Sequence, residues 1–233
     1  MKRFYKAAEV ADAAASGLFR ITLDGRPLRT PAKAVLEVPC RRFAAAIAEE
    51  WAGQGEVIDR RAMPLTAYAC SAIDLIAAKR DKVVAEVAAY GGHDLLCYRA
   101  EAPAGLAAKQ QAQWQPLLDW AALSFDAPLK VTSGVVSVAQ APAALGALRG
   151  AVEALDDFEL AVLGSAVTAA GSLVIGLALH AGHIGPRAAF EAAQLDELYQ
   201  AERWGEDPEA QRRREAIEAE LSAAARAFDL LRG

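Results

Sequence analysis

Residues 160–179 form a run of twenty residues without a charged side chain. Such a run either spans a bilayer or lies inside a protein core, because a helix that is apolar on all sides is not stable in water. Alanine, glycine, serine and threonine fill more than half of the run, and Gly171 and Ser172 interrupt its middle. Small residues let neighbouring helices approach, so we predict a buried central segment of one or two helices. A segment that spans or attaches to a membrane is the alternative.

The N-terminal part of the chain carries a β-hairpin pattern. Residues 18–30 alternate between apolar and polar side chains on both sides of the dipeptide Asp24-Gly25. An Asp-Gly turn between alternating segments is a strong short-range signal for a hairpin. Residues 34–38 and the chain around residues 4–5 are expected to add strands, which gives a small sheet of about three or four strands.

A helix is predicted to cover this sheet. Phe43, Ile47 and Trp51 recur at every fourth position, and Gly53 follows as a helix end. This spacing places the three large side chains on one face. We expect Trp51 to lock the helix onto the sheet, so that its loss unfolds the domain.

From Pro64 onward the apolar residues recur with helical spacing. Segments with this period end mainly at glycine or proline, and residues 129–138 read as an extended connector. The predicted helices cover residues 65–76, 83–90, 106–125, 145–155, 187–204 and 208–231. The predicted fold class is therefore α+β, with a small N-terminal β-rich domain and its covering helix over residues 1–60. A larger all-helical bundle domain is predicted over residues 61–233.

Charge and cysteine content exclude several classes of protein. The net charge is −5, the isoelectric point is near 5.3, and residues 212–214 are the one cluster of arginines. This balance gives no electrostatic footprint for a nucleic acid partner. Cys40, Cys70 and Cys97 are odd in number and widely spaced, which indicates free thiols in a reducing compartment.

The usual motifs of catalysis and nucleotide binding are missing from the sequence. We therefore expect no catalytic residues, no cofactor, no metal ion and no small-molecule substrate. His93 and Asp94, with His180 and His183 later in the chain, are the one set that resembles a metal site. They leave a metal-dependent helical phosphohydrolase using His93 and Asp94 as the alternative function.

The segment with the most concentrated charge lies near the C-terminus. Residues 196–220 hold nine acidic and four basic side chains, so their net charge equals that of the whole chain. On a helix, Glu197, Gln200 and Trp204 lie on one face, which combines a carboxylate with an indole. This face is predicted to bind a partner. The alternative is a helix that buries Leu195, Leu198 and Tyr199 and exposes its acidic side to water.

Seven short motifs occur in a characteristic order along the chain. They are residues 3–6 (RFYK), 23–31 (LDGRPLRTP), 50–54 (EWAGQ), 63–66 (MPLT), 94–98 (DLLCY), 114–120 (WQPLLDW) and 195–205 (LDELYQAERWG). In these motifs the chain resembles the assembly chaperones of the F-type ATP synthase. That family holds the α subunit of the catalytic head before it meets the β subunit.

This resemblance implies a chaperone without catalysis or nucleotide that binds the unassembled α subunit transiently. A covering protein needs aromatic side chains for an apolar patch and carboxylates for exposed basic residues. The partner-binding residues implied in this way are Glu197, Tyr199, Gln200, Glu202 and Trp204, with Glu197 as the first choice.

The N-terminus starts with MKRFYKAAEV and shows no apolar or Arg/Ser-rich leader. Mitochondrial members of the family carry an import leader. The chain is therefore expected to be a bacterial homologue that works in the cytoplasm, without insertion into a membrane.

Overall fold

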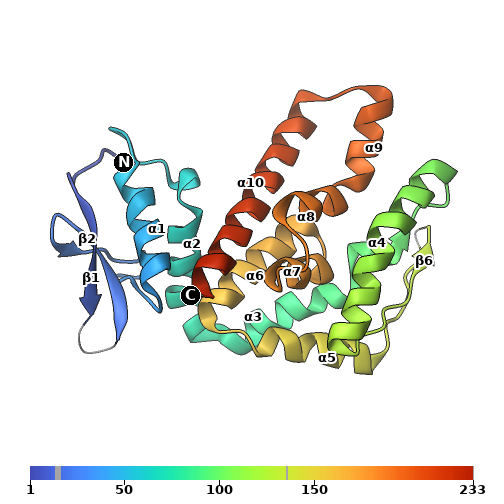
Figure 1. Cartoon of the computed structure of the whole chain (residues 1–233), viewed down its shortest axis with the longest axis horizontal. Coiled ribbons are helices and arrows are strands. Elements are labelled where there is room, and N and C mark those ends of the chain that lie inside the picture. Colours follow the sequence, from blue (N-terminus) through green and yellow to red (C-terminus); the bar gives the residue numbers. More distant parts are fainter. Residues whose placement is uncertain (14–16, 135, 233) are drawn as a thin grey trace. The chain divides into compact units, whose positions relative to one another are not determined.

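The computed structural model describes residues 1–13, 17–134 and 136–232, and its contacts divide the chain into two compact units. The first unit comprises Met1–Arg80, Asp156–Val162 and Arg226–Gly233. The second comprises Asp81–Leu155 and Leu163–Ala225. A small sheet comes first in the chain and helices follow, so the α+β fold class is confirmed (Figure 1). The domain boundary at residue 60 stays a prediction.

The first unit is built around a four-stranded antiparallel sheet. Its strands are β1 Ala8–Ala13, β2 Leu18–Leu23, β3 Arg26–Pro27 and β4 Glu37–Val38. Strand β2 pairs with each of the other three. The predicted hairpin is confirmed, with Asp24 at φ 48° and Gly25 at φ 76° joining β2 to β3. Two successive residues with positive φ form the turn whose twist suits a two-residue hairpin.

The strand expected around Phe4 and Tyr5 is wrong, because β1 begins only at Ala8. The N-terminal segment is instead held by the end of the first helix. The Tyr5 hydroxyl donates to the Trp51 carbonyl at 2.7 Å, and Arg3 donates to the Gln54 carbonyl at 2.5 Å. Tertiary hydrogen bonds therefore override the local strand preference.

Helix α1, Arg41–Ala52, covers the sheet as predicted and packs on β1 and β2 (Figure 1). Phe43 and Ile47 are fully buried, whereas Trp51 is half-buried and lies 5.6 Å from the Tyr5 ring. The main anchor of α1 is therefore its first two turns. Helix α1 ends at Gly53, whose backbone N–H donates to the Glu49 carbonyl at 2.9 Å.

Helices make up most of the remaining chain. They are α2 Pro64–Ser71, α3 Ala77–Ala89, α4 Ala104–Phe125, α5 Pro142–Glu153, α6 Asp157–Ala170, α7 Leu173–His180, α8 Pro186–Ala193, α9 Leu195–Trp204 and α10 Pro208–Leu231. A π-helical turn over Ala72–Ile76 joins α2 to α3, and short 3₁₀ turns cover Arg60–Ala62, Tyr90–His93 and Leu95–Cys97. A parallel pair of two-residue strands, β5 Tyr98–Arg99 and β6 Thr132–Ser133, interrupts the helices.

The single helix predicted over residues 187–204 is wrong, because the structure has two helices there. Helix α8 ends at Ala193 and α9 begins at Leu195. Gln194 between them has φ −113° and ψ 19°, outside the helical region. The apolar spacing continues across the bend, so the sequence pattern does not show it.

The uncharged run forms α6 and α7, which are buried as predicted. The helices separate at Gly171, whose φ of 68° is unfavourable for other residues. At Gly176 an added Cβ would lie 2.6 Å from Val167 Cγ2, so glycine permits the close approach of α6 and α7. Within the described residues, no helix combines the length and the apolar content that a membrane crossing requires.

The N-terminus of α7 is closed by two buried polar side chains. Asp94 accepts hydrogen bonds from the Ser172 hydroxyl at 2.7 Å, from Leu96 N at 3.1 Å and from Val174 N at 3.0 Å. Ser172 Oγ in turn accepts from Ile175 N at 3.0 Å. Burial raises the pKa of the Asp94 carboxyl above its ordinary value, while these hydrogen bonds act in the opposite direction.

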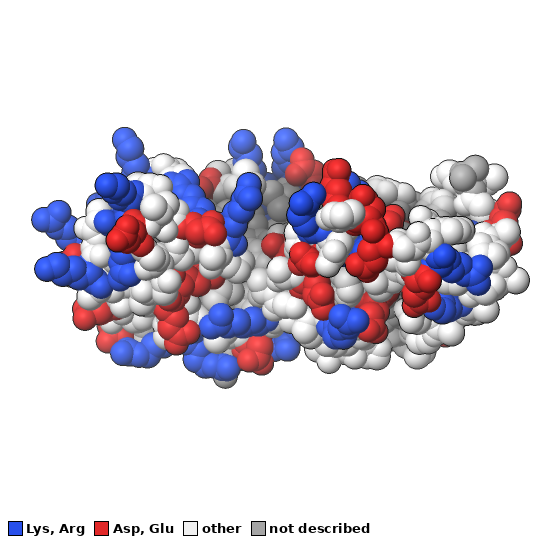
Figure 2. All heavy atoms as spheres, turned by 90° about the horizontal axis from the view of Figure 1, so that it is seen from above, with Lys and Arg blue, Asp and Glu red and all other residues white. Residues whose placement is uncertain are grey.

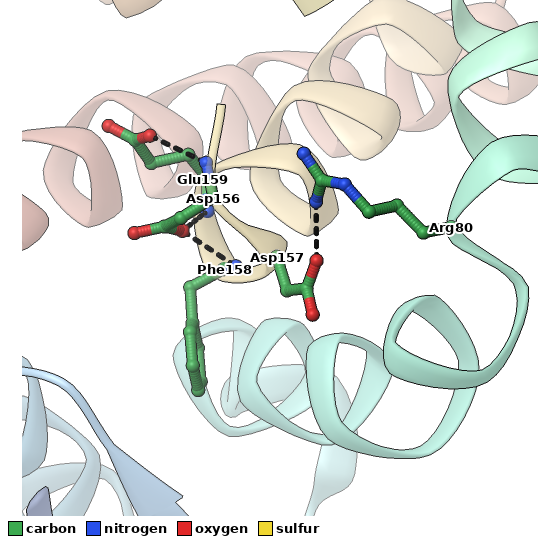
Figure 3. A network of polar contacts seen from close by, with 5 residues as sticks. All are labelled: Arg80, Asp156, Asp157, Phe158 and Glu159. Atoms are coloured by element: carbon green, nitrogen blue, oxygen red, sulfur yellow. Dashed lines mark hydrogen bonds and ion pairs between the residues drawn. The ribbon is translucent and has the colours of Figure 1, made fainter. Parts of the chain in front are cut away.

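The N-terminus of α6 is closed by a capping box (Figure 3). Asp156 Oδ1 accepts from the backbone N–H groups of Phe158 and Glu159, both at 2.8 Å. Glu159 Oε2 reaches back to accept from Asp156 N at 3.1 Å. Arg80 pairs with Asp157 in the same turn, on the side away from the Phe158 ring. Carboxylates thus accept from the first N–H groups of both helices, Asp156 in α6 and Asp94 in α7.

These caps predict different costs for two isosteric changes. In Asp94→Asn, one amide N–H must face a donor in a buried site, so we expect a loss of about 2 kcal/mol in the free energy of unfolding. In Asp156→Asn, the amide oxygen can still cap the exposed turn, so the loss should stay within about 0.5 kcal/mol. Urea unfolding of both variants measures the difference. Equal losses would contradict the capping role of Asp94.

Candidate partner-binding surface

Helix α9 carries the predicted partner-binding residues on the surface of the second unit. It begins after the bend at Gln194, has Asp196 and Glu197 in its first turn and ends at Gly205, where φ is 89°. Acidic side chains in a first turn are favoured by the helix dipole. Leu195 and Tyr199, one turn apart, are the buried residues of α9.

Helix α4 fixes the position of α8 and α9. The buried Gln110 donates from Nε2 to Asp196 Oδ1 at 2.7 Å. The buried Trp114 donates from its indole nitrogen to the Ala192 carbonyl at 2.9 Å. Both bonds lie close to the bend between the two helices, so they attach the start of α9 to α4.

Tyr199 does not lie on the exposed face. Its ring is 96% buried between two cations, with the Arg203 guanidinium 4.4 Å and Lys109 Nζ 5.4 Å from the ring centroid. Its hydroxyl is buried and has no hydrogen-bond partner within the described chain. The geometry gives Tyr199 a supporting role, because it holds Lys109 and Arg203 against the helix.

The other four predicted residues, Glu197, Gln200, Glu202 and Trp204, are exposed. Trp204 is 76% exposed, the largest value for an aromatic side chain in the described residues. Glu202 pairs with Lys109 at 2.9 Å, whereas the side chains of Glu197 and Gln200 have no hydrogen bond or ion pair to the described residues. Figure 2 shows acidic side chains gathered on one face, right of centre.

A pocket of about 440 Å³ beside α9 was not predicted. It is lined by Lys109 and Gln113 of α4, Arg187 and Glu191 of α8, Leu195, Leu198, Tyr199, Ala201 and Glu202 of α9, and Glu206. Arg187 is paired with Glu191 at 2.7 Å and with Glu218 at 2.9 Å. These residues lie on separate helices far apart in the chain, so no local pattern identifies them. Their charges are largely paired with one another.

The structure does not assemble the alternative metal site. His93 is exposed and lies 5.5 Å from the Tyr90 ring, while Asp94 is buried and caps α7. His183 stacks on Trp120, with ring centroids 4.9 Å apart. The described residues contain no group of three or more His, Cys, Asp or Glu side chains that could hold a metal ion. The phosphohydrolase hypothesis therefore has no structural support.

Comparison with known proteins shows similarity over the whole chain. A family model described as ATP12 chaperone protein matches residues 2–122. The chain is 44% identical to Atp12 from Paracoccus denitrificans, with 99% of this chain and 98% of that one covered and a TM-score of 0.92. A protein of Agrobacterium tumefaciens proposed to be a chaperone is 38% identical, with 99% and 85% covered and a TM-score of 0.92. The mitochondrial atp12 protein of Schizosaccharomyces pombe is 24% identical over 220 residues, which cover 88% of this chain and 74% of that protein.

The contrast between Tyr199 and Trp204 gives a stability prediction. Tyr199→Ala removes a buried ring and should lower the free energy of unfolding by about 3 kcal/mol. Trp204→Ala should change it by less than about 0.5 kcal/mol, because the side chain is exposed. Tyr199→Phe serves as the control, since it removes only a hydroxyl without a partner and should be nearly neutral. Denaturant midpoints would contradict this account if Trp204→Ala were the more damaging change.

Proposed function

The chain belongs to the ATP12 chaperone protein family, the assembly chaperones of the ATP synthase, and from this premise we propose that it binds the unassembled α subunit of an F-type synthase. It covers the α surface that later contacts β and releases it on assembly. Covering a surface requires no bond to be made or broken, so the chain acts without catalytic residues, nucleotide or cofactor. We further propose that it acts in the cytoplasm of a bacterium.

One observation carries the proposed binding face. Trp204 is exposed at the end of a helix whose other end carries the unpaired Glu197. Exposing an indole to water has a free-energy cost, and a carboxylate without a partner is available for one. Tryptophan is also enriched among the residues that dominate binding energy in protein interfaces. The bonds from Gln110 and Trp114 hold the start of α9 before any partner binds, which lowers the ordering cost of binding.

The face predicts the chemistry of its partner. An acidic surface with one large aromatic side chain suits a client patch that combines lysine or arginine with apolar side chains. An α subunit that lacks its β neighbour exposes an interface that is prone to aggregate. Covering such a patch is sufficient to keep the subunit soluble.

The proposal is tested by the aggregation of isolated α subunit. Added chaperone should suppress light scattering without nucleotide, and Glu197→Lys should weaken binding about tenfold through charge repulsion with a basic client patch. Trp204→Ala should weaken it by a similar factor. Binding of the wild-type chain should decrease as ionic strength rises.

Glu86→Lys is the matched control, because Glu86 is an exposed glutamate of α3 whose partner, Lys82, is also exposed. This variant should bind like the wild type. Because Glu197 lies in a first turn, Glu197→Lys should cost about 0.5 kcal/mol of stability through the helix dipole. Full suppression by Glu197→Lys, or unfolding of this variant, would reject Glu197 as a binding residue. A wild-type chain that leaves the α subunit to aggregate would reject the function itself.

A further inference from the structure

The first unit contains a groove with a volume of about 970 Å³ that is open to solvent. Its walls come from the N-terminal segment, the β2–β3 hairpin with the turn that follows it, the end of α1 and the start of α2. The floor is apolar and made of buried side chains, Leu23, Leu28, Leu36, Ile58 and Met63. Among the described residues that line the groove, none belongs to α9. The groove and the binding face on α9 are therefore formed by different residues.

Apolar side chains are also exposed at the margin of this groove. Phe4 is 64% exposed and Met1 is 63% exposed, and both line the groove. Their positions are fixed by the backbone, because Arg3 N donates to the Glu56 carbonyl at 2.8 Å and Ile58 N donates to the Met1 carbonyl at 2.8 Å. The Phe4 ring is therefore held in water by a well-bonded segment. A fixed apolar margin of this kind marks a contact surface.

Three arginines line the groove, Arg26, Arg29 and Arg60. All three are exposed, and none has an ion pair with a carboxylate of the described residues. Among the described residues, the Arg29 side chain donates to the Lys33 carbonyl, at 2.7 Å. Figure 2 shows lysine and arginine side chains among acidic ones on the face of this unit that is in view. The groove therefore presents cationic groups beside an apolar floor.

Asp24 is the one carboxylate among the described residues that line the groove. Its oxygens accept from Lys6 N at 3.0 Å and from Ala7 N at 2.9 Å, and its charge offsets only part of the positive charge of the three arginines, mainly at Arg26. These backbone hydrogen bonds lower the pKa of Asp24 and keep the carboxylate committed to the N-terminal segment. The electrostatic complement of the groove is thus an anion supplied by a ligand.

Resting on the proposed function, we propose that this groove binds an extended client segment with apolar side chains on its floor and carboxylates paired with Arg26, Arg29 and Arg60. The chemistry of the segment is that of an acidic, apolar peptide. It is opposite in charge to the client patch that suits α9.

A peptide fits the groove better than a small molecule for two reasons. The groove is open along its margin, so a compact ligand would leave much of its surface in water, whereas small-molecule sites enclose most of the ligand. Its arginines also come from different segments, the hairpin and the turn before α2. Separated cations suit a chain that carries carboxylates at intervals.

The test uses the full-length protein and fluorescently labelled, overlapping peptides that cover the α subunit, with binding followed by anisotropy. Peptides that combine apolar residues with Asp or Glu should bind the wild type. Arg60→Glu should weaken this binding about tenfold. Ala67→Trp, which adds an indole at an exposed position lining the groove, should weaken it without a change in charge.

Arg61→Glu is the matched control, because Arg61 is exposed in the same 3₁₀ turn and does not line the groove. It should bind the peptides as the wild type does. Equal weakening by Arg60→Glu and Arg61→Glu would overturn the proposal, since only general charge would then matter. Decanoate is the second probe. Binding of decanoate that depends on Arg60, without binding of any peptide, would also overturn it in favour of a small anionic ligand.

Different experimental results would reject the groove proposal and the proposed function. If the wild type suppresses α-subunit aggregation and Arg60→Glu and Ala67→Trp suppress it equally well, while no peptide binds, the groove is rejected and the chaperone function stands. If the wild type does not suppress aggregation, the function is rejected. Weaker suppression by both groove variants, with unchanged thermal unfolding, supports the groove.

Discussion

Enclosing the uncharged run of residues 160–179, which lies in α6 and α7, is the constraint on which the rest of the structure depends. Helices α6 and α7 cannot expose their sides to water, so other helices must surround them. The first N–H groups of each helix lack partners within the helix, and at the buried start of α7 they require protein acceptors. Asp156 and Glu159 supply these for α6, and Asp94 and Ser172 supply them for α7.

The sequence predicted those features that depend on local chemistry. The Asp24-Gly25 turn, the first turn at Pro64 and the break at Gly171 each require a particular backbone conformation, so residue type alone identifies them. Two local predictions were wrong, at the strand around Phe4 and at the unbroken helix through Gln194. In both cases, hydrogen bonds from distant residues determine the local path of the chain.

The candidate sites were harder to predict because they depend on tertiary contacts. The alternative interpretation of α9 expected Tyr199 to be buried, and it is, but helical spacing could not show that Lys109 of α4 lies against its ring. The groove of the first unit was missed entirely, because its lining comes from segments spread over the first seventy residues. Each segment has an ordinary local pattern. Only the fold brings Arg26 and Arg60 to the same groove.

The motifs that support the family resemblance prove to be mainly structural. Glu50 caps α2 by accepting from Leu65 N and Thr66 N, each at 2.8 Å. Asp94 caps α7, and Trp114 and Asp196 tie α4 to α8 and α9. Such residues specify the architecture whatever the partner, which explains why the resemblance identifies the fold so well.

A binding residue is distinguished by the opposite property, a motif side chain that the fold does not use. Glu197 and Trp204 have this property in the second unit, because both are exposed and neither is bonded to the described residues through its side chain. In the first unit, Phe4 and Arg26 are exposed and line the groove, and Arg26 has no ion pair with the described residues. Because the described structure makes little use of these side chains, we propose them as the residues that contact another molecule.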